Sequence, residues 1–321
     1  MIIDGHNDLV LHRWRGEGTS HMDLDAALAA GFSGGFFALY VPSPRGPDPV
    51  QIPYAMPLPD PISHDEAAVV AEELFATLCE LPVARADGVD DFREGAITAI
   101  VHLEGAEPLA DDLSDLEQWY ERGLRPVGLV WSRPNAFAEG VPFRFPSSPD
   151  TGQGLSAAGR ELVRACNGLG ILVDLSHLNE AGFWDVDRIS DAPLVATHSN
   201  AHALCPASRN LTDEQLDAVR DSGGVVGVNF AVSFLREDGH NDPDTPIGEI
   251  VRHVDYLAER MGIDHVAFGS DFDGALVPDE LGGVAGLPRL VAALRDAGYD
   301  DEAVAKVTHR NWLRVLAETW R

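Results

Sequence analysis

Histidine and carboxylate residues stand at spacings that suit metal binding. His6 and Asp8 are two residues apart, so in an extended segment their side chains lie on one face, where both can bind one ion. His177 and His198 each follow an apolar run, and a neutral imidazole is a good zinc ligand. The alternatives are a solvated turn for the first pair and core histidines bonded to backbone carbonyls for the second.

A carboxylate that could bridge two ions follows residues 100–103. Glu104 ends this mainly apolar run, where an unpaired charge is costly, and a pair of metal ions would offset that cost. A bridging carboxylate can hold two cations about 3.5–4 Å apart, as in two-metal hydrolysis. Many barrels of the amidohydrolase type use a carboxylated lysine instead, but the single lysine, Lys306, lies in the final helical stretch. Glu104 is therefore the predicted bridge, with an ion pair to an arginine as the alternative.

Two further carboxylates follow the last apolar run. A calcium loop starting at Asp271 would need Glu at its twelfth position, which is Gly282, so that interpretation fails. Asp271 is predicted to move a proton near a metal-bound water molecule. Asp273 either shares that role or caps the next helix, and a polar turn is the alternative for both residues.

Eight short apolar runs, separated by helical patterns, must position these residues. Such a series is typical of parallel strands joined by crossover helices, and eight strands close a (β/α)8 barrel, so we predict an α/β protein with this TIM-barrel fold. Catalytic groups lie at the C-terminal strand ends of such barrels. Polar clusters end five of the runs and contain every candidate named above. The runs are residues 2–4, 36–41, 96–103, 126–130, 170–174, 193–197, 224–229 and 265–269.

Helix start and stop signals fall between these runs. Ser63 and Glu66 form a predicted capping box before a helix that ends near Leu81, and residues 212–215 open a second helix in the same way. Gly168 follows a third helical stretch and is expected to end it in the left-handed conformation.

The chain is expected to form one domain. The Pro-rich residues 41–61 are interpreted as a long loop at one end of the barrel, because residues on both sides of it are needed to reach eight strands. A linker between two domains is the alternative. We therefore predict a single metallohydrolase domain over residues 1–321.

Charge and composition exclude several classes of protein. Acidic residues outnumber basic ones by 52 to 23, giving a net charge of −29, so nucleic acids and anionic membranes are excluded as partners. Cys79, Cys166 and Cys205 are too far apart for a thiolate zinc cluster or a disulfide framework. Residues 1–6 do not resemble a signal peptide, and no apolar run approaches about 18 residues. We expect a soluble cytoplasmic protein.

The strand-end motifs, in this order, resemble the membrane (renal) dipeptidase family of zinc peptidases, within the amidohydrolase-type barrels. The resemblance covers nearly the whole chain and rests on residues 4–8, 104–105, 174–177, 198–199, 209–210 and 270–274. It implies a zinc-dependent dipeptidase with two zinc ions. The implied ligands are strand-end residues: His6 and Asp8 on one ion, His177 and His198 on the other, and Glu104 between them.

The resemblance also implies roles for two further residues. Asp271 would transfer the proton, and Arg209 would clamp the terminal carboxylate of a dipeptide, including one with a C-terminal D-residue. A guanidinium offers a planar fork that matches a carboxylate, although position alone does not select Arg209 among the arginines. Water activated by two cations would attack the peptide carbonyl. The resemblance suggests a homodimer as well.

One residue departs from the family pattern. The best-known members carry a histidine after the fourth strand that contacts the scissile carbonyl, and this chain aligns Trp131 there. Trp donates one hydrogen bond but cannot accept a proton or carry charge. Arg133 is a candidate replacement donor, and hydrolysis of another small amide or lactone is an alternative function. A non-catalytic binding or scaffold barrel is a third interpretation, against which the buried carboxylates argue.

Overall fold

Eight parallel strands, taken in chain order, build a nearly closed barrel. The computed structural model describes residues 1–43 and 52–320, and the predicted (β/α)8 fold is confirmed there. Each barrel strand overlaps one predicted apolar run. In the order in which they pair, the strands are β1 (Ile2–Asn7), β2 (Phe32–Tyr40), β5 (Thr98–Glu104), β6 (Leu124–Gly128), β8 (Leu172–Asp174), β9 (Val195–Ser199), β10 (Val225–Val228) and β11 (Val266–Phe268).

The first and last strands meet near their C-terminal ends. Asn7 and Phe272 form a parallel bridge. The amide of Asp8 donates to the carbonyl of Phe272 at 2.8 Å, and the amide of Asp271 donates to the carbonyl of His6 at 3.0 Å. His6, Asp8 and Asp271, which the sequence predicts to be functional, therefore also supply backbone hydrogen bonds that join the first and last strands.

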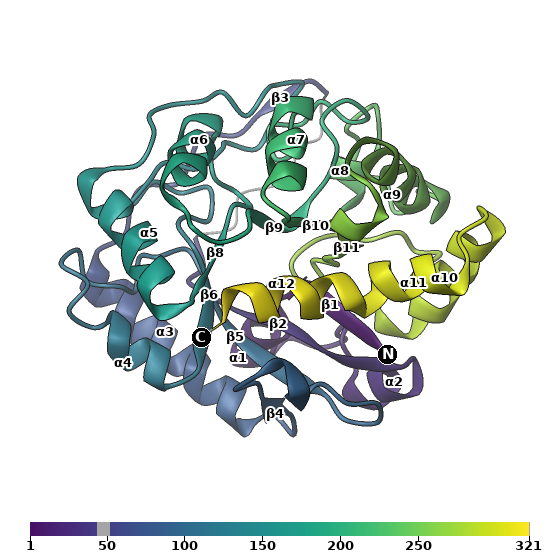
Figure 1. The fold of residues 1–321 in the computed structure, drawn as a ribbon, viewed down its shortest axis with the longest axis horizontal. Helices are drawn as coiled ribbons and strands as arrows, with labels where there is room; N and C mark the ends of the chain where they lie inside the picture. The colour runs from purple at the N-terminus through teal and green to yellow at the C-terminus, as the bar shows by residue number, and fades with distance from the viewer. Residues whose placement is uncertain (44–51, 321) are drawn as a thin grey trace.

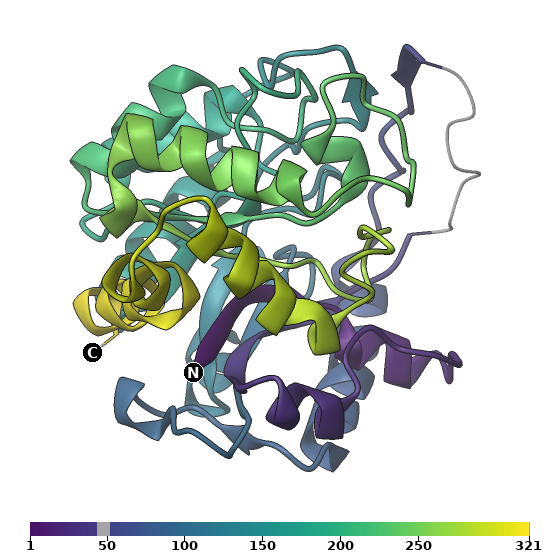
Figure 2. The same ribbon diagram turned by 90° about the vertical axis from the view of Figure 1, so that its right-hand side faces the viewer.

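Helices surround the strands (Figure 1). The side view in Figure 2 places α12 at one end of the molecule and the short strand β3 at the other. The helices are α1 (Leu9–Trp14), α2 (Leu24–Ala29), α3 (His64–Glu80), α4 (Leu116–Glu121), α5 (Ala157–Leu169), α6 (Glu180–Ile189), α7 (Asp213–Asp221), α8 (Val232–Leu235), α9 (Gly248–Met261), α10 (Leu287–Asp296), α11 (Asp301–Ala305) and α12 (Asn311–Thr319).

Two predicted helix starts are confirmed and one predicted stop is wrong. Ser63 caps α3 through a capping box with Glu66, and Thr212 caps α7 in the same way. Helix α5 continues through Gly168 and ends at Gly170, which has φ of 72°. Because glycine adopts this left-handed conformation without a Cβ clash, Gly170 rather than Gly168 is the stop signal.

The predicted loop of residues 41–61 contains a short strand. Residues 44–51 lie outside the described part of the chain, but β3 (Tyr54–Ala55) pairs antiparallel with β7 (Arg144–Phe145). The rings of Tyr54 and Phe145 stack with centroids 6.0 Å apart. This small two-stranded sheet joins segments that follow two different barrel strands.

The floor of the barrel is filled by Trp312 of α12. Its indole nitrogen donates to the carbonyl of Phe268 at 2.9 Å, and its side chain packs with Ile3 and Phe36. A Cβ on Gly5 would lie 2.5 Å from Trp312 Cζ2, and a Cβ on Gly227 would lie 3.0 Å from it. The absence of a side chain at both glycines therefore leaves room for the indole beneath the strand ends that carry the candidate site.

We predict that Trp312→Ala lowers the free energy of unfolding by about 3–5 kcal/mol, because it leaves a large cavity among fully buried neighbours. Urea denaturation followed by circular dichroism measures the change. Trp14→Ala, on a half-buried side chain of α1, is the control and should lower the free energy of unfolding by less. Equal losses in the two variants would contradict the proposed role of Trp312 as the barrel floor.

Candidate metal centre

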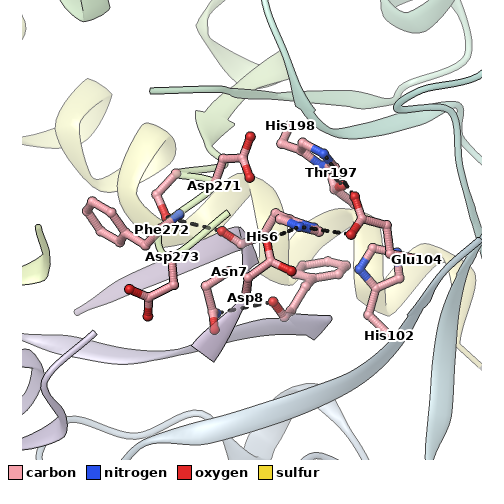
Figure 3. Close-up of polar contacts among 12 residues, drawn as sticks. His6, Asn7, Asp8, His102, Glu104, Thr197, His198, Asp271, Phe272 and Asp273 are labelled. Atoms are coloured by element: carbon pink, nitrogen blue, oxygen red, sulfur yellow. Dashed lines mark hydrogen bonds and ion pairs between the residues drawn. The ribbon is translucent and has the colours of Figure 1, made fainter. Parts of the chain in front are cut away.

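Three predicted ligands from two strands lie together at the C-terminal end of the barrel (Figure 3). His6 Nε2 lies 3.3 Å from Asp8 Oδ2 and 3.6 Å from Glu104 Oε2. The side chains of all three residues are at most 5% exposed. Strand β1 supplies His6 and ends one residue before Asp8, whereas Glu104 is the last residue of β5.

The other two predicted ligands approach Glu104 through its second oxygen. Glu104 Oε1 lies 3.2 Å from His177 Nε2 and 3.5 Å from His198 Nε2. The two Nε2 atoms are themselves 3.1 Å apart. His177 follows β8 with a left-handed φ of 67°, and His198 lies within β9. Glu104 thus contacts His6 through one oxygen and the His177–His198 pair through the other, while the rings of His6 and His198 stack with centroids 3.8 Å apart.

Hydrogen bonds define the tautomer of His198. Asp174 accepts hydrogen bonds from the amide and the hydroxyl of Thr197. Although burial acts in the opposite direction, these bonds and nearby His102 hold the pKa of Asp174 below its usual range. The Thr197 hydroxyl donates its single proton to that ionised carboxylate at 2.6 Å. It must therefore accept the hydrogen bond that it forms with His198 Nδ1 at 2.8 Å. His198 Nε2 therefore presents a lone pair to the site.

The donor set fits metal ions. Burial lowers the pKa of His177 and His198 well below the usual range, so both imidazoles are neutral. A lone pair of His198 directed at another imidazole nitrogen and a carboxylate is unfavourable without a cation between them. Buried atoms His6 Nδ1 and Asp8 Oδ1 also have no hydrogen-bond partner among the described residues. Imidazole and carboxylate groups in this arrangement are typical zinc ligands.

The buried carboxylates make the site strongly acidic. Burial raises the pKa of Glu104 well above its ordinary value, and it raises the pKa of Asp271 as well. Burial alone would lower the pKa of His6, but the negative charges of Glu104 and Asp8 raise it to about 10. The protein therefore concentrates negative charge where water cannot solvate it, which favours divalent cations.

Asp271 lies beside the first ligand pair. It groups with His6 and Asp8, with ligand atoms within 4.8 Å of one another. Asp271 Oδ2 accepts a hydrogen bond from Asn229 Nδ2 at 2.9 Å. A Cβ on Gly274 would lie 2.2 Å from Asp8 Oδ2 and 2.4 Å from Asp271 Oδ1, so glycine leaves room for both carboxylates. Sequence reasoning missed Asn229, although it ends the seventh predicted run with a polar residue.

Asp273 has neither of the roles that the sequence suggested. Its carboxylate accepts hydrogen bonds from Ser20 Oγ and the His21 amide, both at 2.6 Å. The Asp273 amide in turn donates to His21 Nδ1 at 3.0 Å. Figure 3 shows this carboxylate pointing away from Glu104. Asp273 therefore holds the segment before α2 against the end of β11.

Arg209 is a buried guanidinium without a charged partner. Its side chain lies near Phe234, 5.6 Å from the ring centroid, and Nη2 donates to the His198 carbonyl at 3.1 Å. Arg209 Nε has no hydrogen-bond partner, and the described residues supply no carboxylate in an ion pair with this side chain. Burial lowers the pKa of Arg209 to about 10. The guanidinium can therefore bind an anionic group that enters the site.

Arg133 is not available as the replacement donor that the sequence suggested. Its Nε and Nη2 atoms contact Glu107 Oε1 at 3.1 and 3.0 Å, and Nη2 also donates to the Val41 carbonyl. Both charged side chains of this pair are 1% exposed. Trp131, in contrast, is half-buried and lies beside His177, with ring centroids 5.7 Å apart.

Sequence reasoning also missed a hydroxyl that supports a predicted ligand. Ser132, fully buried with φ of 44°, places its Oγ atom 2.9 Å from His177 Nδ1. The left-handed conformation of a non-glycine residue is strained, and such strain often marks functional positions.

The lone lysine lies elsewhere, because Lys306 Nζ pairs with Asp264 Oδ1 at 2.7 Å. It cannot supply a carboxylated bridge.

A parallel barrel with histidine and carboxylate side chains gathered at its C-terminal strand ends is an arrangement typical of metal-dependent hydrolases. The family model of the membrane dipeptidases, peptidase family M19, matches residues 1–320. The chain belongs to this family, which makes it a metallo-dipeptidase by class and confirms the resemblance seen in the sequence. A metal cofactor and a small peptide substrate follow at the level of the family.

Three relatives illustrate the range of similarity. A Rhodobacter sphaeroides metallopeptidase, solved with a phosphinate mimic of the dipeptide L-Ala-D-Ala, shares 47% identity over 99% of both chains, with a TM-score of 0.96. An uncharacterized Klebsiella pneumoniae protein from the pqqA 5′ region is 55% identical over 73% of this chain and 86% of its own length. The Claviceps purpurea dipeptidase tcpJ is 30% identical over 93% of this chain and 69% of its own length.

Within residues 1–43 and 52–320, no helix is both long enough and apolar enough to cross a bilayer.

We predict that Ser132→Ala weakens Zn²⁺ binding about 10- to 100-fold, because His177 loses the partner that orients its ring. Competition with a fluorescent chelator measures the affinity. Ser199→Ala is the matched control, since Ser199 Oγ is equally buried but makes no hydrogen bond within the described chain. Equal affinities in the two variants would show that the Ser132 contact does not support metal binding.

Proposed function

We propose that this chain is a zinc-dependent dipeptidase that cleaves the peptide bond of dipeptides, including those with a C-terminal D-residue, at a two-metal centre. The position of Glu104 carries the proposal. Its Oε2 atom lies 3.6 Å from His6 Nε2, and its Oε1 atom lies 3.2 Å from His177 Nε2. A carboxylate that bridges two ions needs its two oxygens directed at separate ligand groups in this way. The L-Ala-D-Ala mimic bound by the Rhodobacter sphaeroides relative supports the substrate class.

In this proposal the ligands divide between two ions. His6 and Asp8 would hold one ion, His177 and His198 would hold the other, and Glu104 would be shared between them. When bound, two zinc ions would supply the Lewis acidity that activates a water molecule and polarises the peptide carbonyl. The hydrogen bonds to His177 Nδ1 and His198 Nδ1 keep each imidazole turned with Nε2 towards the ions.

Asp271 would move the proton. Asn229 holds its Oδ2 atom, which leaves Oδ1 free beside Asp8. Because burial raises the pKa of Asp271, this carboxyl is better matched to both proton uptake and proton release than an exposed aspartate. It can accept a proton from the attacking water and deliver it to the amine that leaves.

Arg209 would orient the substrate. Its guanidinium is buried, lies next to His198 in the site and lacks a carboxylate partner among the residues described. The C-terminal carboxylate of a dipeptide supplies that partner. This pairing would favour dipeptides over longer or capped peptides, because it requires a free carboxylate one residue after the scissile bond.

Three other features stay predictions alongside this function. They are the single domain over residues 1–321, the cytoplasmic location and the homodimer. Size-exclusion chromatography with light scattering would test the homodimer.

Purified wild-type protein should hold two zinc ions per chain and cleave L-Ala-D-Ala. Glu104→Gln should hold fewer ions and lose about a hundredfold or more in kcat/KM, because several kcal/mol of charge stabilisation depend on the paired ions. Elemental analysis and an amino-acid release assay measure both effects. Glu94→Gln, at an 82% exposed side chain, is the control. A metal-loaded wild type that cleaves no dipeptide would refute the proposed function.

Wild-type protein should prefer L-Ala-D-Ala to its C-terminal amide, and Arg209→Gln should lose most of that preference. A hydrogen-bonded charge pair is worth about 1.5–3 kcal/mol, so we expect the ratio of kcat/KM values to fall about 10- to 100-fold. Arg164→Gln, which alters an exposed ion pair with Glu161, should leave the ratio unchanged. A preference that survives in Arg209→Gln would place the carboxylate site elsewhere.

A further inference from the structure

A row of aromatic side chains runs beside the proposed metal centre. Trp131 and Phe143 are both half-buried, and their centroids lie 5.7 and 6.2 Å from that of His177. The two rings are 5.5 Å from each other. Tyr40 extends the row at one end, with its centroid 4.8 Å from that of Trp131. Phe234 extends it at the other end, with its centroid 6.2 Å from that of Phe143. His177 thus contacts the middle of a continuous aromatic surface.

The order of the rings gives a bound dipeptide a direction. The Arg209 guanidinium lies by Phe234, at the far end of the row from Trp131. A dipeptide with its carboxylate at Arg209 and its scissile bond at His177 runs along the row, since one extended residue spans about 3.3–3.6 Å. Its C-terminal residue then lies by Phe143. Its N-terminal residue lies on the other side of His177, by Trp131.

The chemistry of Trp131 suits an apolar side chain. The indole carries no charge, and within the described chain its nitrogen has no hydrogen-bond acceptor, so its contacts with the protein are those of its ring. Tyr40 next to it accepts a hydrogen bond from the Ser43 amide at 3.2 Å. A polar substrate side chain would have only the Trp131 N–H and the Tyr40 hydroxyl as partners there, so it would recover only part of the hydrogen bonding that it loses with water.

We propose that Trp131 is a specificity-determining residue that selects dipeptides with an apolar N-terminal side chain. This inference rests on the proposed dipeptidase function and adds the substrate class.

The test compares substrates of matched shape. L-Leu-D-Ala and L-Asn-D-Ala differ in the polarity of the N-terminal side chain, and L-Ala-D-Leu and L-Ala-D-Asn differ in the same way at the C-terminal residue. The kcat/KM ratio within each pair is measured for zinc-loaded wild type, Trp131→Ala, Trp131→Phe and Trp131→His. Trp184→Ala, at a half-buried tryptophan of α6, is the matched control.

We expect wild type to favour L-Leu-D-Ala over L-Asn-D-Ala about tenfold or more, the scale on which pocket contacts discriminate between side chains. Trp131→Ala and Trp131→His should lower that ratio about tenfold, whereas Trp131→Phe and Trp184→Ala should keep most of it. The ratio within the second pair should not change in any variant. If Trp131→Ala does not fold or loses zinc, Trp131→His provides the test, because it keeps a ring at this position.

Two outcomes would overturn the inference while leaving the dipeptidase function intact. One is a wild-type ratio near one for the first pair, with normal cleavage of L-Ala-D-Ala. The other is an unchanged ratio in a Trp131 variant that retains its zinc. Failure of zinc-loaded wild type to cleave any of these dipeptides would instead contradict the proposed function itself.

Discussion

The charge of Glu104 is the constraint on which the site depends. A carboxylate with 4% of its side chain exposed, at the end of a central strand, needs positive charge close to both of its oxygens. At Oε1 the neighbouring side chains do not supply it, because His177 and His198 are kept neutral by burial. The lone pair of His198 Nε2 instead adds to the demand for cations. The hydroxyls of Ser132 and Thr197 then fix the orientation of the two rings.

The same region also brings the barrel together. The bridge between Asn7 and Phe272 joins the first and last strands, and the flanking residues His6, Asp8 and Asp271 belong to the site. Ligands that bind across this seam would favour the joined strands by mass action, since they bind the folded arrangement and not the separated strands. Stability and chemistry therefore depend on the same few residues, so substitutions where the first and last strands meet should impair both.

The periodic features of this fold could be predicted from the sequence. Apolar runs mark the eight strands, and polar residues at or shortly after the end of such a run single out Glu104 and His177. Contacts between distant segments left no such pattern. The hydrogen bond from Ser20 to Asp273, the pairing of Glu107 with Arg133, and the two-stranded sheet β3–β7 depend on which loops meet in space. The stop at Gly170 was misplaced because two nearby glycines give the same local signal and packing chooses between them.

The contact between Gly5 and Trp312 joins the two extremes of the chain. Contacts between residues so distant in sequence form late, because the loop that they close is nearly as long as the chain itself. A growing polypeptide can therefore pair its early strands, but it cannot seal the barrel beneath them before α12 emerges from the ribosome. Until then any barrel built from the early strands stays open at the floor that Trp312 fills.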